Sequence, residues 1–376
     1  MRIRDLGYVP GQLPTGPKNS ILDVPDVLVG QTTIHEGDAV HTGVTVILPR
    51  KLQDLPKSCY AGLHELNGMG EMTGSHQVHE YGYINTPIAL TNTLSVGKVY
   101  DAIFRWQIEQ ARARGEDELE MFRSIGLPVV CETLDIVLND ISRSSVEKYH
   151  VYAALDQAIN APEVLEGSHG GGTGTSSRIV KGLEGKEYTV GVLCQANYGY
   201  MKDLRIGGVP IGRLLEKDAL ENAKDEENLQ NEPKGKANEG SCIVIIATDA
   251  PFLPHQLRRL AQRATVGLSE VTGHGVGRTF SGEIFLAFST ASPPDNLLSR
   301  SNDSGYQPLA ESFQTGSIKN ESIDTFFYAV AEATEESVLN AMVAAKDGLT
   351  GWKGRSVEGL PVEIVKELLK QYYVPV

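Results

Sequence analysis

The sequence predicts an α/β protein in which helices pack on sheets. Two short and nearly continuous apolar runs, residues 241–250 and 282–290, are typical of strands that are buried on both faces. Residues 96–114 instead carry apolar side chains at 96, 99, 100, 103 and 104, which is the spacing of one helix face. Strands buried on both faces need covering layers, so we expect sheets packed between helices.

Further strands and helices follow the same patterns along the chain. Residues 42–48 and 188–194 are rich in β-branched residues and are predicted as strands. Residues 254–264 and 334–346 are predicted as helices. The second of these is expected to begin at Thr334, because the run T-E-E-S suits a helix N-cap.

Composition is that of a folded acidic protein. The chain has 376 residues, of which 41% are hydrophobic and 22% charged, so we expect one large domain over residues 1–376. The net charge of −14 argues against a nucleic-acid partner, which would need a basic surface. Residues 1–16 lack the apolar segment of a signal peptide, and no run of about 18 apolar residues follows. We therefore expect a cytoplasmic protein without a membrane partner.

No metal or cofactor is expected from the motifs. The cysteines are widely spaced and form no zinc pattern, so they are predicted to be buried free thiols. Two histidines in H-Q-V-H-E match neither zinc-peptidase spacing and are expected to be ordinary polar or packing residues. The residues concerned are Cys59, Cys131, Cys194, Cys242, His76 and His79.

A polar segment precedes the central apolar run. Residues 216–240 contain eight acidic and four basic residues and almost no large apolar ones. Such a composition buries too little surface to offset chain entropy, so we predict a mobile linker. The linker ends at Gly240, and Ser241 begins the predicted strand.

This Gly-Ser junction has the chemistry of a self-cleaving site. A serine hydroxyl needs a base, and a serine that begins a chain can use its own α-amine, whose pKa is about 8. Such an end is made when the hydroxyl of Ser241 attacks the carbonyl before it and the resulting ester hydrolyses. A glycine at 240 leaves that carbonyl open, and the strand holds the nucleophile rigidly.

Two other places could supply the remaining catalytic groups. Ser281 and Glu283 are two residues apart at the head of a predicted strand, so their side chains share a face and can form a relay. Asn197 directly follows a strand-like run and could donate to an oxyanion. The catalytic base is then either the Ser241 amine or Glu283 acting through Ser281.

Nine stretches in one order resemble the DmpA/BapA family of N-terminal-nucleophile aminopeptidases (L-aminopeptidase/D-esterase and β-peptidyl aminopeptidase). The resemblance covers roughly residues 40–365. The stretches are NGMGEMTG (67–74), PIALTNTLSVGKVYDA (87–102), VVCETLDIVLND (129–140), GGGTGTSSRIVKG (170–182), QANYG (195–199), LRIGGVPIG (204–212), GSCIVIIATDAPF (240–252), SGEIFLAF (281–288) and ATEESVLNAMVAA (333–345).

The resemblance implies an αββα sandwich that cleaves itself into residues 1–240 and 241–376. It further implies a homo-oligomer, often a tetramer, of the processed pairs, with peptide, amide or ester substrates that have a free N-terminus, including D- or β-residues. By position, Ser241 matches the nucleophile, and Ser281 and Glu283 match the residues that assist it. Asn197 matches the oxyanion donor, and Glu132 the carboxylate that receives the substrate's amine.

The sequence departs from the family beside Glu132. The family commonly has an aromatic residue, often tyrosine, where this chain has Leu134, and a glycine where it has Ile136. Both residues are expected to reshape the substrate pocket. Two alternatives to the aminopeptidase stay open: an acyltransferase of the ornithine acetyltransferase type, and a relative that binds a ligand without catalysis.

Overall fold

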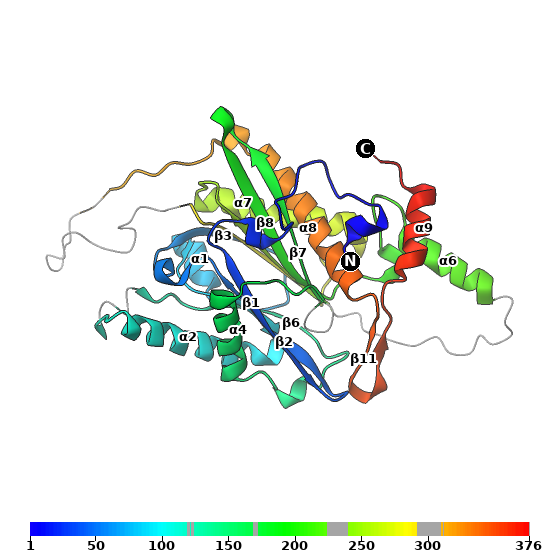
Figure 1. Ribbon diagram of the computed structural model, residues 1–376, viewed down its shortest axis with the longest axis horizontal. Helices are drawn as coiled ribbons and strands as arrows, with labels where there is room; N and C mark the ends of the chain where they lie inside the picture. Colours follow the sequence, from blue (N-terminus) through cyan, green and yellow to red (C-terminus); the bar gives the residue numbers. More distant parts are fainter. Residues whose placement is uncertain are drawn as a thin grey trace.

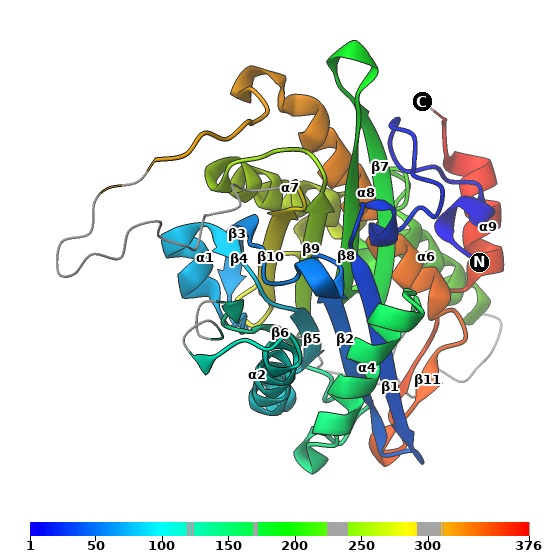
Figure 2. The same cartoon turned by 60° about the vertical axis from the view of Figure 1, so that its left-hand side comes forward.

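Figures 1 and 2 show the computed structural model, which describes residues 1–118, 121, 124–167, 172–223, 240–291, 310 and 312–375. The strands are β1 (Leu28–Glu36), β2 (Val40–Leu48), β3 (Cys59–Gly68), β4 (Tyr83–Ile84), β5 (Ile88–Asn92), β6 (Val129–Thr133), β7 (Thr173–Lys181), β8 (Glu187–Ala196), β9 (Ser241–Thr248), β10 (Gly282–Ser289), β11 (Leu349–Thr350) and β12 (Ser356–Val357). The helices are α1 (Ser75–Tyr81), α2 (Val96–Ala113), α4 (Lys148–Asn160), α6 (Ile211–Ala223), α7 (Pro254–Thr272), α8 (Asp324–Ala344) and α9 (Val362–Tyr372).

Two large sheets form the centre of the fold. One has the strand order β1-β2-β5-β6, and the other has the order β4-β3-β10-β9-β8-β7. Strand β9 lies between β8, to which it is antiparallel, and β10, to which it is parallel. All of its side chains are buried, which explains its unbroken run of valine and isoleucine.

Helices cover the outer face of each sheet. Helices α2 and α4 pack on the sheet of β1, β2, β5 and β6, and α7 and α8 pack on the other sheet. Figure 2 shows α4 in front of β1 and β2, and α8 behind β7 and β8. A third apolar core, which includes Ile47, Ile88, Ile245 and Leu286, fills the space between the two sheets. The layers therefore follow the order helix, sheet, sheet, helix, which the family resemblance implied.

Most predicted elements are confirmed, but one helix begins elsewhere. Helix α7 extends to Thr272, beyond the predicted end at residue 264. Helix α8 begins at Asp324, so the prediction that Thr334 caps its N-terminus is wrong. Thr334 and the glutamates after it are buried in the middle of the helix.

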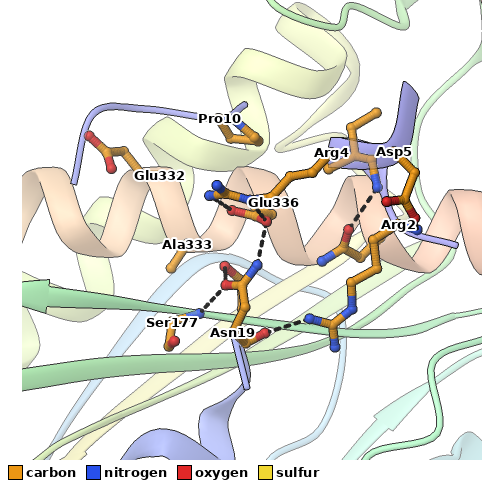
Figure 3. Close-up of polar contacts among 12 residues, drawn as sticks. Arg2, Arg4, Asp5, Pro10, Asn19, Ser177, Glu332, Ala333 and Glu336 are labelled. Atoms are coloured by element: carbon orange, nitrogen blue, oxygen red, sulfur yellow. Dashed lines mark hydrogen bonds and ion pairs between the residues drawn. The ribbon is translucent and has the colours of Figure 1, made fainter. Parts of the chain in front are cut away.

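The N-terminal segment before β1 explains why these polar residues are buried. Arg4 donates two hydrogen bonds to Glu336, at 2.6 and 2.8 Å, and Arg178 on β7 pairs with the same carboxylate at 2.8 Å. The side chains of Arg178 and Glu336 are both 0% exposed. Figure 3 shows Glu336 on α8 receiving contacts from Arg4 and Asn19 of the N-terminal segment. The two glutamates of the run T-E-E-S therefore meet this segment from the middle of a helix, and the run is not a cap.

The first part of the predicted linker is helical, so the prediction of a mobile segment from residue 216 is wrong there. Residues 216–223 belong to helix α6, because leucine, glutamate and alanine there favour a helix. The rest of the predicted linker, residues 224–239, lies outside the described residues. Gly240 is described, and it is buried where the chain enters β9.

Two further expectations concern the cysteines and the membrane. All four cysteines are buried and unbridged, as predicted: Cys59, Cys131, Cys194 and Cys242. Within the described ranges, no helix has the length and apolar character needed to cross a bilayer.

Candidate active site

Ser241 is the first residue of β9 and directly follows Gly240. Along this strand Ile243 and Ile245 face the core between the sheets, whereas Cys242 and Val244 face the core beneath the helices. Alternation therefore assigns Ser241 to the inter-sheet side, and only 5% of the residue is exposed. Cys242 is buried on the opposite side, as predicted for a core residue.

The main chain at Gly240 has no room for a side chain. A Cβ built on this residue would lie 2.5 Å from the carbonyl oxygen of Asn197 and 2.7 Å from the Cα of Tyr198. Both neighbours are backbone atoms, which cannot move aside as a flexible side chain could. Glycine at 240 is therefore required by close packing, independently of any chemical role.

Asn197 follows β8 and contacts Ser241 through two of its groups and Leu134 through a third. Its side-chain Oδ1 accepts the main-chain N–H of Ser241 at 2.6 Å, and its own main-chain N–H donates to the Ser241 carbonyl at 3.0 Å. Its Nδ2 donates to the Leu134 carbonyl at 2.6 Å. An amide nitrogen carries two hydrogens, so the second N–H of Nδ2 stays available to another acceptor.

Ser281 and Glu283 are joined by the hydrogen bond that their spacing predicts. The Ser281 hydroxyl donates to Oε1 of Glu283, which also accepts the Gly277 N–H at 3.2 Å. Glu283 is fully buried, and burial raises the pKa of its carboxyl. Its Oε2 has no hydrogen-bond partner in the described part of the chain.

Strand register places this pair next to Ser241, but on the other face of the sheet. Gly282 on β10 pairs with Ser241 on β9, so Ser281 and Glu283 flank the position beside Ser241. Glu283 lies on the same face of β10 as Phe285, which faces the helices, and it pairs with Cys242, which faces them too. A relay from Glu283 to Ser241 would therefore have to pass through Ser281, which precedes the strand.

Glu132 lies near the end of β6, an edge strand of the other sheet. It is 5% exposed, and it accepts hydrogen bonds from the Thr93 hydroxyl and, at 3.2 Å, from the Glu71 N–H. Burial raises the pKa of its carboxyl, and the two charged groups that influence it, Glu71 and Asp135, are both acidic. No basic side chain in the described residues thus balances this buried carboxylate.

The loop between β3 and α1 lies between Glu132 and the start of strand β10, which pairs with β9. A Cβ built on Gly70 would lie 3.3 Å from Oε1 of Glu132 and 3.5 Å from the Cα of Gly282. Asn67, near the end of β3, donates to the Arg278 carbonyl at 2.6 Å and to the Ser281 carbonyl. The sequence stretch 67–74 carried the family resemblance, but no role followed from it, because these contacts join segments far apart in the chain.

The segment after Glu132 supports Asn197. The Leu134 carbonyl holds the Asn197 amide, while the Leu134 side chain is half-buried. Asp135 accepts from the Thr42 hydroxyl at 2.7 Å and from Asn139 Nδ2 at 3.0 Å, which fixes the following turn. Sequence reasoning found Leu134 through the family pattern and missed Asp135, whose partners come from β2 and from the turn itself.

Comparison with known proteins assigns the chain to a family. The sequence model of peptidase family S58 matches residues 19–357. A β-peptidyl aminopeptidase of Sphingosinicella microcystinivorans is 38% identical over 391 aligned residues, which cover 99% of this chain and 92% of the relative.

Solved structures give the same result. A β-aminopeptidase of Burkholderia sp. superposes with a TM-score of 0.81 at 39% identity, over 100% of both chains. The L-aminopeptidase D-Ala-esterase/amidase of Ochrobactrum anthropi, described as a variant of the Ntn hydrolase fold, superposes with a TM-score of 0.83 at 35% identity, over 99% of this chain and 98% of that one. The chain therefore belongs to peptidase family S58 and is a serine aminopeptidase.

Proposed function

We propose that this aminopeptidase is self-processing and that Ser241 is its nucleophile. Cleavage of the Gly240–Ser241 bond would give pieces of residues 1–240 and 241–376. The observation that carries the proposal is the geometry at that bond: its nitrogen is held by Oδ1 of Asn197 at 2.6 Å, at the buried start of β9. The serine hydroxyl attacks the Gly240 carbonyl, the chain shifts from nitrogen to oxygen, and water hydrolyses the ester.

Processing converts the Ser241 nitrogen from an amide into an amine. The same hydrogen bond to Asn197 Oδ1 then orients that amine, whose pKa near 8 suits a base at neutral pH. Glu283 lies on the opposite face of the sheet from the side assigned to Ser241. We therefore favour the amine as the base. Ser281 and Glu283 are assigned a positioning role: their hydrogen bond fixes the start of β10 beside Ser241.

Glu132 is the proposed receiver of the substrate's ammonium group. A buried carboxylate without a basic partner is costly, and a bound cation offsets that cost. Recognition of a free amine also excludes internal peptide bonds, which carry no such charge. Both features fit an enzyme that removes N-terminal residues.

The catalytic cycle follows from these positions. With the substrate's ammonium at Glu132, the hydroxyl of Ser241 adds to the carbonyl carbon of the first substrate residue. The α-amine of Ser241 takes the proton from that hydroxyl. The second N–H of Asn197 Nδ2 stabilises the oxyanion. The leaving group of the substrate takes that proton from the Ser241 amine. Water then hydrolyses the acyl ester and releases the acyl group from Ser241.

The substrate class is proposed as peptides, amides or esters with a free N-terminus. The printed names of the relatives specify β-peptidyl, L-aminopeptidase and D-Ala-esterase activities. We propose that D- or β-residues are accepted here too, with Leu134 forming part of the pocket wall. Processed pairs are further proposed to assemble into a cytoplasmic homo-tetramer, which light scattering of the purified protein would test.

The test combines a denaturing gel with a substrate panel. We expect two bands for the wild type, one for Ser241→Ala, and release of p-nitroaniline from L-, D- or β-aminoacyl p-nitroanilides by the wild type only. Adding a competing amine separates hydrolysis from acyl transfer, because a transferase would convert most of the substrate into the new amide. A full-length wild-type band, or no turnover of the panel, would contradict the proposal.

A further inference from the structure

Two glycines near the end of β3, Gly68 on the strand and Gly70 in the loop after it, have different surroundings. A Cβ built on Gly68 would meet no atom within 4 Å. A Cβ built on Gly70 would meet Oε1 of Glu132 at 3.3 Å, the Cα of Gly282 at 3.5 Å and Cδ1 of Ile284 at 3.6 Å. The missing side chain of Gly70 thus points between the carboxylate and strand β10.

Gly70 lies between the two groups that a substrate must join. Gly282 pairs directly with Ser241, the proposed nucleophile, and Glu132 is the proposed receiver of the ammonium. In the reverse direction, a Cβ on Gly282 would lie 2.4 Å from the Met69 carbonyl oxygen and 3.0 Å from the Cα of Gly70. The loop therefore packs on the start of β10 with no side chain from either glycine between them.

The two oxygens of Glu132 differ in their partners. Oε2 accepts the Thr93 hydroxyl, and among the described residues Oε1 accepts the Glu71 N–H at 3.2 Å. A carboxylate oxygen has two acceptor positions, so Oε1 can still receive a donor. It is the oxygen that faces Gly70.

We propose that Gly70 is a specificity-determining residue, because its missing side chain leaves Oε1 of Glu132 open to the primary ammonium group of the substrate. The inference rests on the proposed ammonium role of Glu132. A methyl group at residue 70 would cover Oε1 and displace the ammonium from the carboxylate. The strand pairing of Ser241 would stay in place, because the contacts of that methyl to Gly282 and Ile284 are ordinary van der Waals distances.

A role in packing alone makes a different prediction. If Gly70 served only the approach of the loop to Gly282, Gly70→Ala would lower stability and self-cleavage and reduce kcat. If it keeps Oε1 open, the change would raise KM for free-amine substrates and leave kcat and cleavage nearly unchanged. Gly68→Ala is the matched control, two residues away at the end of β3, where a Cβ would meet no atom within 4 Å.

The experiment compares wild type, Gly70→Ala and Gly68→Ala on the best p-nitroanilide of the substrate panel. We expect KM to rise at least fivefold in Gly70→Ala with kcat within twofold, and both constants to stay within twofold in Gly68→Ala. Cleavage on a denaturing gel and the melting temperature should match the wild type. A KM within twofold, or a joint loss of kcat, cleavage and melting temperature, would overturn the inference.

A measurement on the wild type covers the case in which Gly70→Ala does not fold. Alaninamide and N-methylalaninamide are compared as competitive inhibitors, because an N-methyl group must occupy the space beside Gly70. We expect N-methylation to raise Ki at least tenfold, and equal inhibition would overturn the inference. Wild-type enzyme without activity on any free-amine substrate would instead defeat the proposed function, which separates the two failures.

Discussion

Oδ1 of Asn197 accepts the main-chain N–H of Ser241 at 2.6 Å, and the main-chain N–H of Asn197 returns a bond to the Ser241 carbonyl at 3.0 Å. The pairing of β8 with β9 thus continues one residue beyond Ala196, and the side chain of Asn197 supplies one of the two hydrogen bonds. The residue predicted to stabilise an oxyanion also fixes the nitrogen that cleavage would release. One side chain therefore connects the proposed processing and hydrolysis steps.

Replacing Asn197 by alanine should impair both steps. The change removes the acceptor for the Ser241 nitrogen and the spare N–H for the oxyanion, so we expect kcat to fall by roughly 10²–10³-fold and self-cleavage to slow. Steady-state kinetics and a cleavage time course measure the two effects. Asn160→Ala, at the end of helix α4 where the amide bonds only to Asp156, is the control. Normal kinetics in Asn197→Ala would contradict the assignment.

Gly240→Ala should block self-cleavage while the rest of the fold forms. The new methyl would lie 2.5 Å from the Asn197 carbonyl oxygen, so the chain must shift away from the attacking hydroxyl. The readout is the fraction of full-length chain on a denaturing gel. Gly316→Ala, at an exposed position where a Cβ meets nothing within 4 Å, should cleave normally. Equal cleavage of the two variants would count against the proposed geometry.

Glu132 should give the aminopeptidase an acid limb in its pH dependence. Burial raises the pKa of Glu132, and only the ionised carboxylate binds an ammonium, so KM should fall as pH rises through that raised value. In Glu132→Gln this limb should vanish and KM at neutral pH should rise at least tenfold. Glu163→Gln, at an exposed loop position after helix α4, serves as the control. An unchanged KM in Glu132→Gln would contradict the proposal that Glu132 binds the substrate's ammonium group.

The identity of the base can be tested at Glu283. If the Ser241 amine is the base, Glu283→Gln should lower kcat but retain a pH limb near 8, where an α-amine titrates. Should that limb shift or disappear in Glu283→Gln, the carboxylate acting through Ser281 would be the base. The pH profile of kcat decides between the two.

Glu335 should make stability depend on pH. Burial raises its pKa from 4.5 to about 7, with the Tyr8 hydroxyl donating to it at 2.6 Å. A raised carboxyl pKa contributes stability below about pH 4.5 that is lost as pH rises through about 7. Glu335→Gln should therefore be more stable than its parent at pH 8, by up to about 3 kcal/mol, and similar to it at pH 4.

The stability test uses a background that stays one chain, because a cleaved protein does not unfold in two states. Urea unfolding of Ser241→Ala with and without Glu335→Gln gives the free energy of unfolding at each pH. Glu363→Gln, exposed on helix α9, is the control. A difference that shrinks between pH 4 and pH 8 would contradict the prediction.

The central strands were predictable because their signal is local. Strands β9 and β10 are buried on both faces, and this appears in the sequence as unbroken apolar runs at 241–250 and 282–290. The hydrogen bond from Ser281 to Glu283 followed from their spacing of two. The start of helix α8 was misplaced because a run of buried polar residues, two of which contact the N-terminal segment, has the composition of a cap.

Residues of the site could be predicted only where the family resemblance or a local spacing indicated them. The position of Glu132 came from the family resemblance, and no local signal shows that Thr93 and Glu71 would hold it. The contacts of Gly70 and Asn67 join β3, β6 and β10, which are far apart in sequence. Such contacts depend on how the two sheets meet, and single-strand patterns carry no information about that.

Mass spectrometry of the purified, active protein under denaturing conditions tests the central claim most directly. We predict two masses, matching residues 1–240 and 241–376, with N-terminal sequencing of the smaller piece beginning Ser-Cys-Ile, and a single full-length mass for Ser241→Ala. A single full-length mass in fully active wild-type enzyme would contradict it.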